Sequence, residues 1–180
     1  MPTKDDAMET PCTIVECDLG DVRHRRALIA LINAYRLHPM GGRLPKLAQS
    51  AELDLIAGLK NHPCSLILFA CFDKKVAGVA VCFMGFSTFS AKPLINVHDL
   101  VVAPRYRRCT VGRAIMEAVI RRAEILGCCR VTLEVRSDNS VAKRLYSGIG
   151  FGPCPVPMEF WVKSLKTSLP RSKDKIVLDD

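Results

Sequence analysis

The sequence predicts an α/β (α+β) fold in which helices pack against a sheet. The first observation is the stretch from Leu94 to Phe151, which reads as strand, basic turn, helix, strand and helix. The second is a pair of apolar runs, residues 65–72 and 76–86, whose polar connection Asp73-Lys74-Lys75 is typical of a hairpin. The third is an amphipathic helix pattern near the start of the chain. Together these elements predict a layered domain.

Length and composition bound the class of protein. With 180 residues, of which 49% are hydrophobic, the chain can bury a single core. We expect residues 1–165 to form one domain and residues 166–180 to form a charged, flexible tail. The first ten residues are polar and acidic, unlike a secretory signal, and the longest apolar run is far shorter than the roughly 18 residues of a membrane helix. We therefore expect a cytoplasmic protein without a membrane segment.

The net charge of +8 raises nucleic acid as a partner. The positive residues fall into separate groups, however, and only the group at residues 105–113 lies where a specific anion is expected to bind. Aromatic residues make up 6% of the chain, too few for a platform on which bases stack. We therefore do not expect a nucleic-acid partner.

The nine cysteines indicate reduced thiols. They form no Cys-x-x-Cys pair, and most lie in or beside expected strands, which suits buried thiols better than disulfides or zinc. We therefore expect no metal site. The cysteines near strands are Cys12, Cys17, Cys64, Cys71, Cys82 and Cys129.

The first third of the chain predicts one strand and two helices. Residues 13–17 form a short strand, and Asp21 caps a helix that runs to about Tyr35 with an apolar inner side. A turn-rich linker leads to a second helix over about residues 47–60. That helix ends before Pro63, which disfavours helical geometry in the residue that precedes it.

The hairpin leads into the central stretch. Residues 94–102 are rich in strand formers and end before Pro104. From Val111 to about Leu126, apolar residues recur at helical spacing, and Gly127 ends that helix.

The rest of the chain predicts a strand, a helix and a last strand. Residues 131–135 alternate between apolar and polar side chains. Residues 138–140 supply cap side chains for a helix whose apolar side ends at Ile149. Three prolines then make a stiff loop, and we expect residues 159–165 to form the last strand.

The turn at residues 107–112 carries the first functional signal. A helix N-terminus presents free backbone N–H groups and a positive dipole, so this turn, with Arg107 and Arg108, can seat a phosphate. Basic turns before helices are, however, usually just solvated. The residues alone leave both interpretations open.

Two motifs in this stretch match the patterns of a known family. The turn Arg107-Arg108-Cys109-Thr110-Val111-Gly112 fits (Gln/Arg)-x-x-Gly-x-(Gly/Ala), except that Thr110 replaces the first glycine. A second pattern, Leu-Glu-Val followed by Asn-x-x-Ala-x-x-Leu-Tyr-x-x-x-Gly-Phe, is matched by Leu133-Glu134-Val135, Asn139, Ala142, Leu145-Tyr146 and Gly150-Phe151. Together they resemble the GNAT superfamily of acyl-CoA-dependent N-acetyltransferases.

The resemblance implies a mixed, mostly antiparallel central sheet, flanked by helices on both faces and split at its centre around acetyl-CoA. In the family, the turn holds the pyrophosphate of coenzyme A. The preceding strand pairs with the pantetheine arm, and a bulge there would free an N–H for the thioester carbonyl. The early helical pair forms one wall of the acceptor cleft. The implied cofactor-binding residues are Leu100, Val101, Val102, Arg107, Arg108, Cys109, Thr110, Val111, Gly112, Arg113, Asn139, Ala142 and Tyr146.

Acetylation of an amine calls for a base. An alkylamine with a pKa near 10.4 is neutral about once in 2,500 molecules at pH 7, a deficit of roughly 4.6 kcal/mol. The candidates are Glu134, His98 and Asp99. The resemblance makes Glu134 the first choice, since the matching glutamate often activates the amine, and a structural ion pair is the alternative. His98 is the second choice. Because successive side chains alternate along a strand, we expect His98 and Asp99 to point to opposite faces.

Three further residues have two interpretations each. Tyr146 lies at helical spacing with apolar residues, which favours a core position, whereas the resemblance implies that its hydroxyl protonates the leaving thiolate. Asn139 fits a helix cap, which we favour over the family's role near the pantetheine. For Thr110 we favour a negative φ, with the hydroxyl offered to a phosphate or to a free N–H. The alternative is a strained positive φ.

We interpret the chain as an N-acetyltransferase that moves an acetyl group from acetyl-CoA to a primary amine by direct attack in a ternary complex. The acceptor is either a small-molecule amine or a protein or peptide amine. Leu-Glu-Val-Arg resembles the members that acetylate protein N-termini, and His98-Asp99-Leu100 looks more like the members that act on diamines. The alternative is a non-catalytic acyl-CoA-binding or partner module on the same fold. The sequence leaves a homodimer open.

Overall fold

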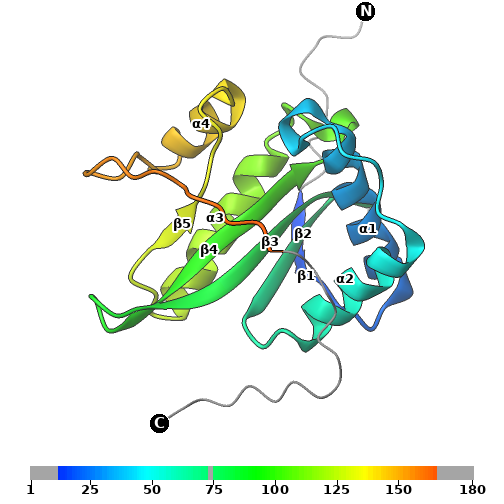
Figure 1. Ribbon diagram of the computed structural model, residues 1–180, viewed down its shortest axis with the longest axis horizontal. Coiled ribbons are helices and arrows are strands. Elements are labelled where there is room, and N and C mark those ends of the chain that lie inside the picture. The colour runs from blue at the N-terminus through cyan, green and yellow to red at the C-terminus, as the bar shows by residue number, and fades with distance from the viewer. Residues whose placement is uncertain (1–11, 73–74, 166–180) are drawn as a thin grey trace, which may run out of the picture.

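A mixed sheet organises the structure (Figure 1). The computed structural model describes residues 12–72 and 75–165. Within them, β1 to β4 pair antiparallel in chain order, and β5 lies parallel to β4 at the end of the sheet. The predicted mixed, mostly antiparallel sheet is therefore confirmed. The strands are β1 (Thr13–Glu16), β2 (Ser65–Phe72), β3 (Lys75–Ser87), β4 (Lys92–Val102) and β5 (Val131–Leu133).

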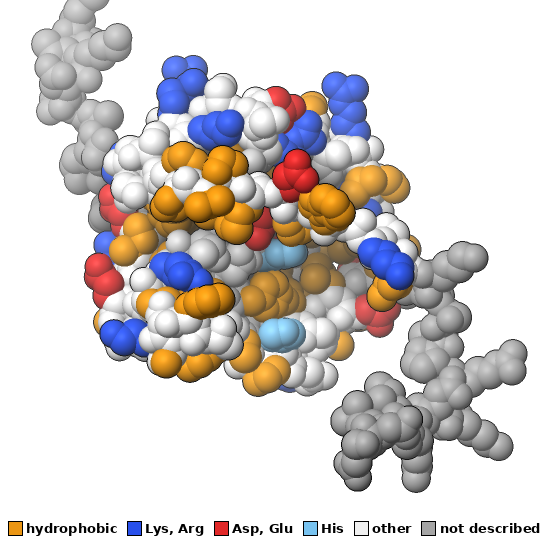
Figure 2. All heavy atoms as spheres, turned by 60° about the vertical axis from the view of Figure 1, so that its left-hand side comes forward, with side chains coloured by type: hydrophobic (Ala, Val, Ile, Leu, Met, Phe, Trp, Pro, Cys, Tyr) orange, Lys and Arg blue, Asp and Glu red, His pale blue; other side chains and the backbone are white. Residues whose placement is uncertain are grey.

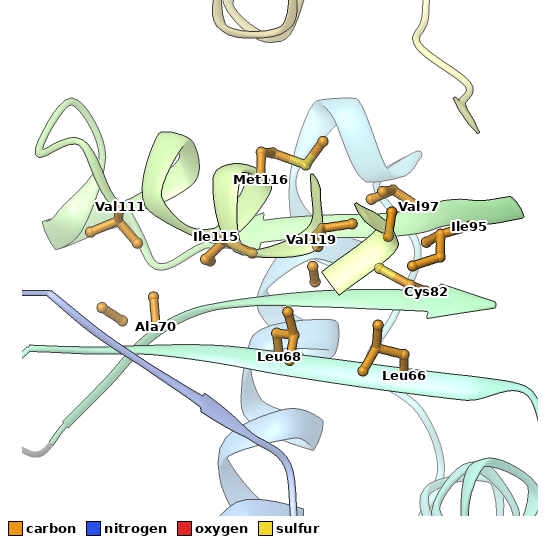
Figure 3. Close-up of a cluster of buried hydrophobic side chains, with 13 residues drawn as sticks. Leu66, Leu68, Ala70, Cys82, Ile95, Val97, Val111, Ile115, Met116 and Val119 are labelled. Carbon is orange, nitrogen blue, oxygen red and sulfur yellow. The ribbon is translucent and has the colours of Figure 1, made fainter. Parts of the chain in front are cut away.

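Helices cover both faces of this sheet, as predicted (Figure 1). On one face, Leu28 of α1 and Phe69 are fully buried. On the other face, Ile115 and Val119 of α3 are fully buried against the sheet (Figure 3). Each such burial contributes about 1.5–3 kcal/mol. The helices are α1 (Val22–Leu37), α2 (Gln49–Asn61), α3 (Val111–Ile125) and α4 (Ser140–Ser147), with short 3-10 turns η1 (Pro39–Gly41) and η2 (Pro104–Tyr106).

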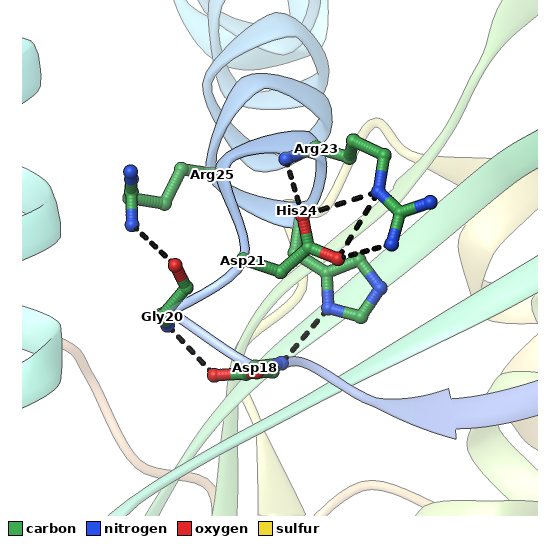
Figure 4. A network of polar contacts seen from close by, with 6 residues as sticks. All are labelled: Asp18, Gly20, Asp21, Arg23, His24 and Arg25. Carbon is green, nitrogen blue, oxygen red and sulfur yellow. Dashed lines mark hydrogen bonds and ion pairs between the residues drawn. The ribbon is translucent and has the colours of Figure 1, made fainter.

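The start of α1 is fixed by the predicted cap (Figure 4). The Asp21 carboxylate accepts a hydrogen bond from the backbone N–H of Arg23 at 2.7 Å and pairs with its guanidinium. The hydrogen bonds from Arg23 lower the pKa of Asp21 to about 2. The Asp18 carboxylate accepts from the N–H of Gly20, and Arg25 donates to the Gly20 carbonyl. The hydrogen bond from the N–H of Arg23 satisfies a first-turn group that a helix leaves unpaired, and the contacts of Gly20 hold the segment that precedes the helix.

The expected strand at residues 159–165 is wrong. Residues 152–165 have no regular secondary structure, and Phe160, Trp161 and Val162 are 78%, 85% and 74% exposed. A strand forms only when its backbone pairs with a neighbour, and no described residue pairs with the outer edge of β5. Consequently Glu134, which follows β5, lies beside an edge strand and not near the end of a central one.

Several expectations concern residues outside the described ranges. They are the charged tail at residues 166–180, the polar N-terminus up to residue 11, and most of the hairpin turn at residues 73–75. Of the helices that are described, none combines the length and the apolar character needed to cross a membrane.

Candidate active site

A cavity opens where β4 and β5 part. The two strands pair over three residues, from Ile95 with Val131 to Val97 with Leu133. From His98 to Val102, β4 has no partner on this side among the described residues. A cavity of about 790 Å³ lies along that stretch. The expected opening in the sheet is present, but it lies between its last two strands and not at its centre.

The cavity gathers residues from distant parts of the chain. The face seen in Figure 2 is hollowed, and histidine, hydrophobic and acidic side chains lie close together there. All three catalytic candidates, Glu134, His98 and Tyr146, line the cavity. Of the predicted cofactor-binding residues, only Cys109 does not. Those that do are Leu100, Val101, Val102, Arg107, Arg108, Thr110, Val111, Gly112, Arg113, Asn139, Ala142 and Tyr146.

The turn before α3 is more strained than we predicted. Arg108 and Thr110 take φ values of 67° and 54°, so the interpretation of Thr110 at negative φ is wrong. The chain must reverse between the end of η2 at Tyr106 and the start of α3 at Val111, and left-handed residues make that reversal. For a β-branched residue this costs roughly 1–2 kcal/mol.

The hydroxyl of Thr110 does not cap the helix. It donates to the carbonyl of Cys109 at 2.8 Å, and among the described residues no side chain caps the N-terminus of α3. First-turn N–H groups therefore remain available to an anion.

The arginines of the turn have different partners. Arg107 donates from Nε to the Val102 carbonyl at 3.2 Å, and its Nη1 lies 3.1 Å from His38 Nε2 at the end of α1. Arg113 instead donates to the Gly148 carbonyl at 3.1 Å and pairs with Glu117. Arg107 thus lies at the edge of the cavity, between the turn before α3 and the end of α1. Arg113 instead links α3 to the end of α4.

Gly112 permits the close approach of α4. A Cβ atom built there would lie 3.1 Å from Leu145 Cδ2 and 3.7 Å from Val102 Cγ2. A larger residue would therefore disturb the packing of α4 as well as the turn itself.

A β-bulge in β4 changes the direction of the candidate bases. Val97 pairs with Cys82 and Asp99 pairs with Val81, so His98 is an extra residue without a partner across the strand pair. The His98 ring packs edge-on against Phe83, with 5.6 Å between centroids. Phe83 and Val81 both belong to the cluster under α1 and α2. His98 and Asp99 therefore face the same side, and the prediction of opposite faces is wrong because the bulge adds one residue to the alternation.

Glu134 faces this side as well. It is exposed, and its Oε1 accepts a hydrogen bond from Asn96 Nδ2 at 3.4 Å. Asn96 pairs directly with Phe83, which fixes the face. In the described part of the chain Glu134 has no ion pair, so the structural alternative to a catalytic role finds no support there.

Asp99 and Tyr35 meet on the same side of the sheet. Burial raises the pKa of the half-buried Asp99, and the neighbouring His98 partly offsets that shift. Burial, followed by the charge of Asp99, raises the pKa of Tyr35 on α1. The charge of Asp99 therefore disfavours the ionisation of Tyr35.

Tyr146 packs against the core and also lines the cavity. Its ring lies beside that of Phe151, with centroids 6.0 Å apart. Burial raises its pKa to about 12, with a further contribution from Tyr35. The hydroxyl therefore stays protonated at neutral pH. The cap at Asn139 is confirmed, since its side chain accepts from the N–H of Ala142 at 3.1 Å.

The sequence did not predict part of the cavity wall. Tyr35, His38 and Met40 line the cavity, yet we predicted only a packing helix and a linker in that region. The one available signal is the resemblance, which assigns a wall of the acceptor cleft to the early helices without naming residues.

The cysteines do not line the cavity. All nine cysteines are free thiols, with Cys82 buried and Cys109 and Cys154 exposed. Burial raises the pKa of Cys82 to about 12, which keeps this thiol protonated and unreactive. Within the described ranges, no three His, Cys, Asp or Glu side chains are grouped so that they could hold a metal ion.

Comparison with known proteins identifies the family. Residues 30–151, more than half of the chain, match the model of the acetyltransferase (GNAT) family. The chain is 31% identical to the uncharacterized N-acetyltransferase YhfO of Bacillus subtilis over 125 residues, which are 69% of this chain and 81% of that protein. It is 33% identical over 66 residues to the ribosomal protein bS18-alanine N-acetyltransferase of Escherichia coli.

That second match is partial, because it covers 37% of this chain and 45% of the relative. Among solved structures, a probable acetyltransferase superposes with a TM-score of 0.69 at 25% identity, covering 87% of this chain and 98% of the other. The chain belongs to the acetyltransferase (GNAT) family.

Proposed function

We propose that this protein transfers an acetyl group from acetyl-CoA to a primary amine by direct attack in a ternary complex. The observation that carries the proposal is the cavity between β4 and β5. The N-terminus of α3 borders this cavity, and three candidate bases, Glu134, His98 and Asp99, line it. Membership of the acetyltransferase (GNAT) family supports the same chemistry.

The residues present fit acetyl-CoA. The N-terminus of α3 has no side-chain cap and stands beside Arg107 and Arg108, which suits a pyrophosphate. Along Leu100–Val102, the free edge of β4 can pair with an extended pantetheine arm as with another strand. Acetyl-CoA, when bound, supplies an activated acetyl thioester. Asn139 and Ala142 line the same cavity and would contact the pantetheine.

The chain's own residues would move two protons. Glu134, our first choice of base, takes a proton from the acceptor ammonium directly or through water, and His98 is the second choice. Tyr146, which is protonated at neutral pH, donates to the leaving thiolate. Because a thiol has a pKa near 8.5 and leaves readily, this acid assists modestly.

The acceptor is a small-molecule amine or a protein or peptide amine. The Escherichia coli relative is named for the alanine of ribosomal protein bS18, which supports a peptide amine. We also propose that residues 1–165 act as one domain in the cytoplasm, where reducing conditions suit nine thiols.

A second candidate is a non-catalytic acyl-CoA-binding module. The left-handed Thr110 favours it, because strain at that residue opposes a well-formed phosphate turn. Glu134 and Tyr146, which both line the cavity, favour the enzyme.

The test is acetyl-CoA consumption in the presence of diamines, monoamines and peptides with N-terminal alanine. Acetylated product supports the enzyme. Saturable binding of acetyl-CoA without consumption supports the module, and absence of binding at millimolar acetyl-CoA contradicts both.

A further inference from the structure

Two histidines end the first two helices in the same way. His38 is the C-cap of α1 and His62 is the C-cap of α2, and a proline follows each of them. Each ring accepts a hydrogen bond at Nδ1 from the backbone N–H two residues further on, from Met40 at 3.2 Å and from Cys64 at 3.3 Å. Because the residue before a proline is held in extended geometry, the local sequence gives both rings the same role.

His38 differs from His62 in that it faces a second donor. Its Nε2 lies 3.1 Å from Nη1 of Arg107, whereas no N–H of the described chain reaches Nε2 of His62. A neutral imidazole accepts at one ring nitrogen and carries a proton on the other, and a guanidinium can only donate. The His38 ring therefore cannot accept from Met40 and from Arg107 at the same time.

The strengths of the two hydrogen bonds decide which one forms when no anion competes for Arg107. A hydrogen bond from a charged donor is roughly twice as strong as one between neutral groups. Arg107 is also held from its other side, since its Nε donates to the Val102 carbonyl at 3.2 Å. His38 then accepts at Nε2 and carries its proton on Nδ1, which faces the N–H of Met40 as a second donor.

An anion on Arg107 would reverse this choice. Arg107 lines the cavity beside the uncapped N-terminus of α3, where we propose that the pyrophosphate binds. A guanidinium pairs more strongly with a phosphate oxygen than with a neutral imidazole, because the phosphate carries the opposite charge. Once Arg107 turns to the anion, His38 can carry its proton on Nε2 and accept from Met40 at Nδ1.

Met40 connects this exchange to the wall of the cavity. Its carbonyl accepts from the Tyr35 hydroxyl at 3.4 Å, and Tyr35, His38 and Met40 all line the cavity. The N–H of Met40 is the group that the His38 side chain caps at the start of η1. The proton position on His38 therefore decides whether η1 has its cap.

We propose that His38 is a positioning residue whose ring tautomer couples the basic turn to the opposite wall of the cavity. It holds Arg107 until a pyrophosphate takes the guanidinium, and it then caps η1 and stabilises the wall that Tyr35 and Met40 form. The ring stays neutral, since one proton leaves Nδ1 and one is gained at Nε2 through solvent. This inference rests on the proposed function, and it makes coenzyme A and the acceptor favour each other's binding.

The first test needs no ligand. Nitrogen-15 NMR of the full chain at pH 8, above the range in which an imidazole usually titrates, reports which ring nitrogen carries the proton. His38→Gln and His62→Gln assign the signals by removing them. We expect the proton on Nδ1 of His38 and on Nε2 of His62. Arg107→Ala should move the His38 proton to Nε2 and slow hydrogen exchange of the Met40 N–H at least threefold.

The matched control is Arg105→Ala, because this arginine lies two residues away and does not line the cavity. It should leave the His38 signals as in the wild type, and none of these arginine changes should alter the signals of His62. A His38 ring that keeps the same tautomer in the wild type and in Arg107→Ala overturns the inference, whatever coenzyme A does.

The second test adds the anion. Millimolar coenzyme A or inorganic pyrophosphate should move the His38 proton to Nε2 in the wild type, whereas pantetheine, which lacks the pyrophosphate, should not. In kinetics, His38→Ala should raise the KM of the amine that the wild type acetylates at least fivefold, mainly through KM and not kcat. His62→Ala, outside the cavity, should behave as wild type.

The outcomes separate this inference from the function on which it rests. If thermal melts show that coenzyme A binds and the His38 tautomer does not change, the coupling is overturned and the proposed function stands. A change of tautomer with pantetheine overturns the coupling as well, because the trigger is then not the pyrophosphate. If coenzyme A does not bind, the proposed function fails, and Arg107→Ala still decides whether Arg107 sets the tautomer of His38.

Discussion

The two sides of the cavity carry opposite charge. On the side of α3, Arg107, Arg108 and the uncapped helix N-terminus face the space. On the side of the β4 bulge, the facing acids are Asp99 and Glu134. The first side suits phosphate and the second suits ammonium. The net charge of +8 therefore describes neither side, and the local arrangement decides which substrate each side would bind.

The largest expected effect comes from a charge reversal on the basic side of the cavity. Arg107→Glu places a carboxylate where we propose the pyrophosphate binds, so acetyl-CoA affinity should fall more than 100-fold. For the wild type, ligand at 100 times Kd adds about 2.7 kcal/mol, or roughly 5–10 °C in Tm for a chain of this length. Thermal melts with and without acetyl-CoA check this, and the variant should show no shift.

The matched control is Arg105→Glu. This neighbouring arginine stacks 4.7 Å from the centre of the Tyr106 ring and does not line the cavity. If both variants lose the thermal shift equally, the effect comes from general charge and the basic side has no specific phosphate seat.

The next effect tests the acidic side. Glu134→Gln should lower kcat about 100-fold and shift or remove the acidic limb of its pH profile, since a lost general base typically costs that much. The Kd for acetyl-CoA should change little. Glu124→Gln, at the far end of α3, serves as control. Full activity from pH 6 to 9 would transfer the role of base to His98.

A smaller effect concerns the proton donor between the two sides. Tyr146→Phe should lower kcat about tenfold or less, because the leaving thiolate is already fairly stable. With a pKa of about 12, Tyr146 remains protonated across pH 6 to 9. The loss should therefore be the same at every pH in that range, as kcat profiles of both proteins can show. A loss that grows with pH would contradict a donor with so high a pKa.

The smallest expected effect concerns the backbone strain on the basic side of the cavity. Thr110→Gly replaces a β-branched residue at φ 54° with the residue that adopts this geometry freely. Relief of up to roughly 1–2 kcal/mol should stabilise the turn and tighten coenzyme A by about three- to tenfold. Titration calorimetry measures it, with Thr110→Ala as the control that removes the hydroxyl but keeps the strain. Equal binding by the glycine variant would mean that the strain is the same with and without coenzyme A, and weaker binding would mean that the wild-type turn relaxes on binding.

Much of this structure could be predicted from local patterns. Apolar spacing and caps located α1 and α3, and the motif around Glu134 indicated residues that line one cavity. The errors arose where a single residue or a distant partner decides the outcome. One extra residue at His98 reverses the alternation that we used for Asp99.

The other errors have the same origin. Residues 159–165 have strand-forming side chains, but pairing requires a neighbouring edge that local sequence does not reveal. His38 reaches Arg107 from 69 positions away, and no periodicity predicts such a contact. The angle at Thr110 depends on the reversal between η2 and α3 and not on the preference of threonine.

The bulge at His98 also bears on which length changes the gene can tolerate. Val97 and Asp99 already face consecutive partners, Cys82 and Val81, on the neighbouring strand. A codon deletion that removes His98 would therefore leave all other pairings of β4 in register, whereas a deletion elsewhere in the strand would swap its faces. His98 can thus be viewed as an insertion into a complete strand, so a shorter ancestor without this imidazole is compatible with the same sheet.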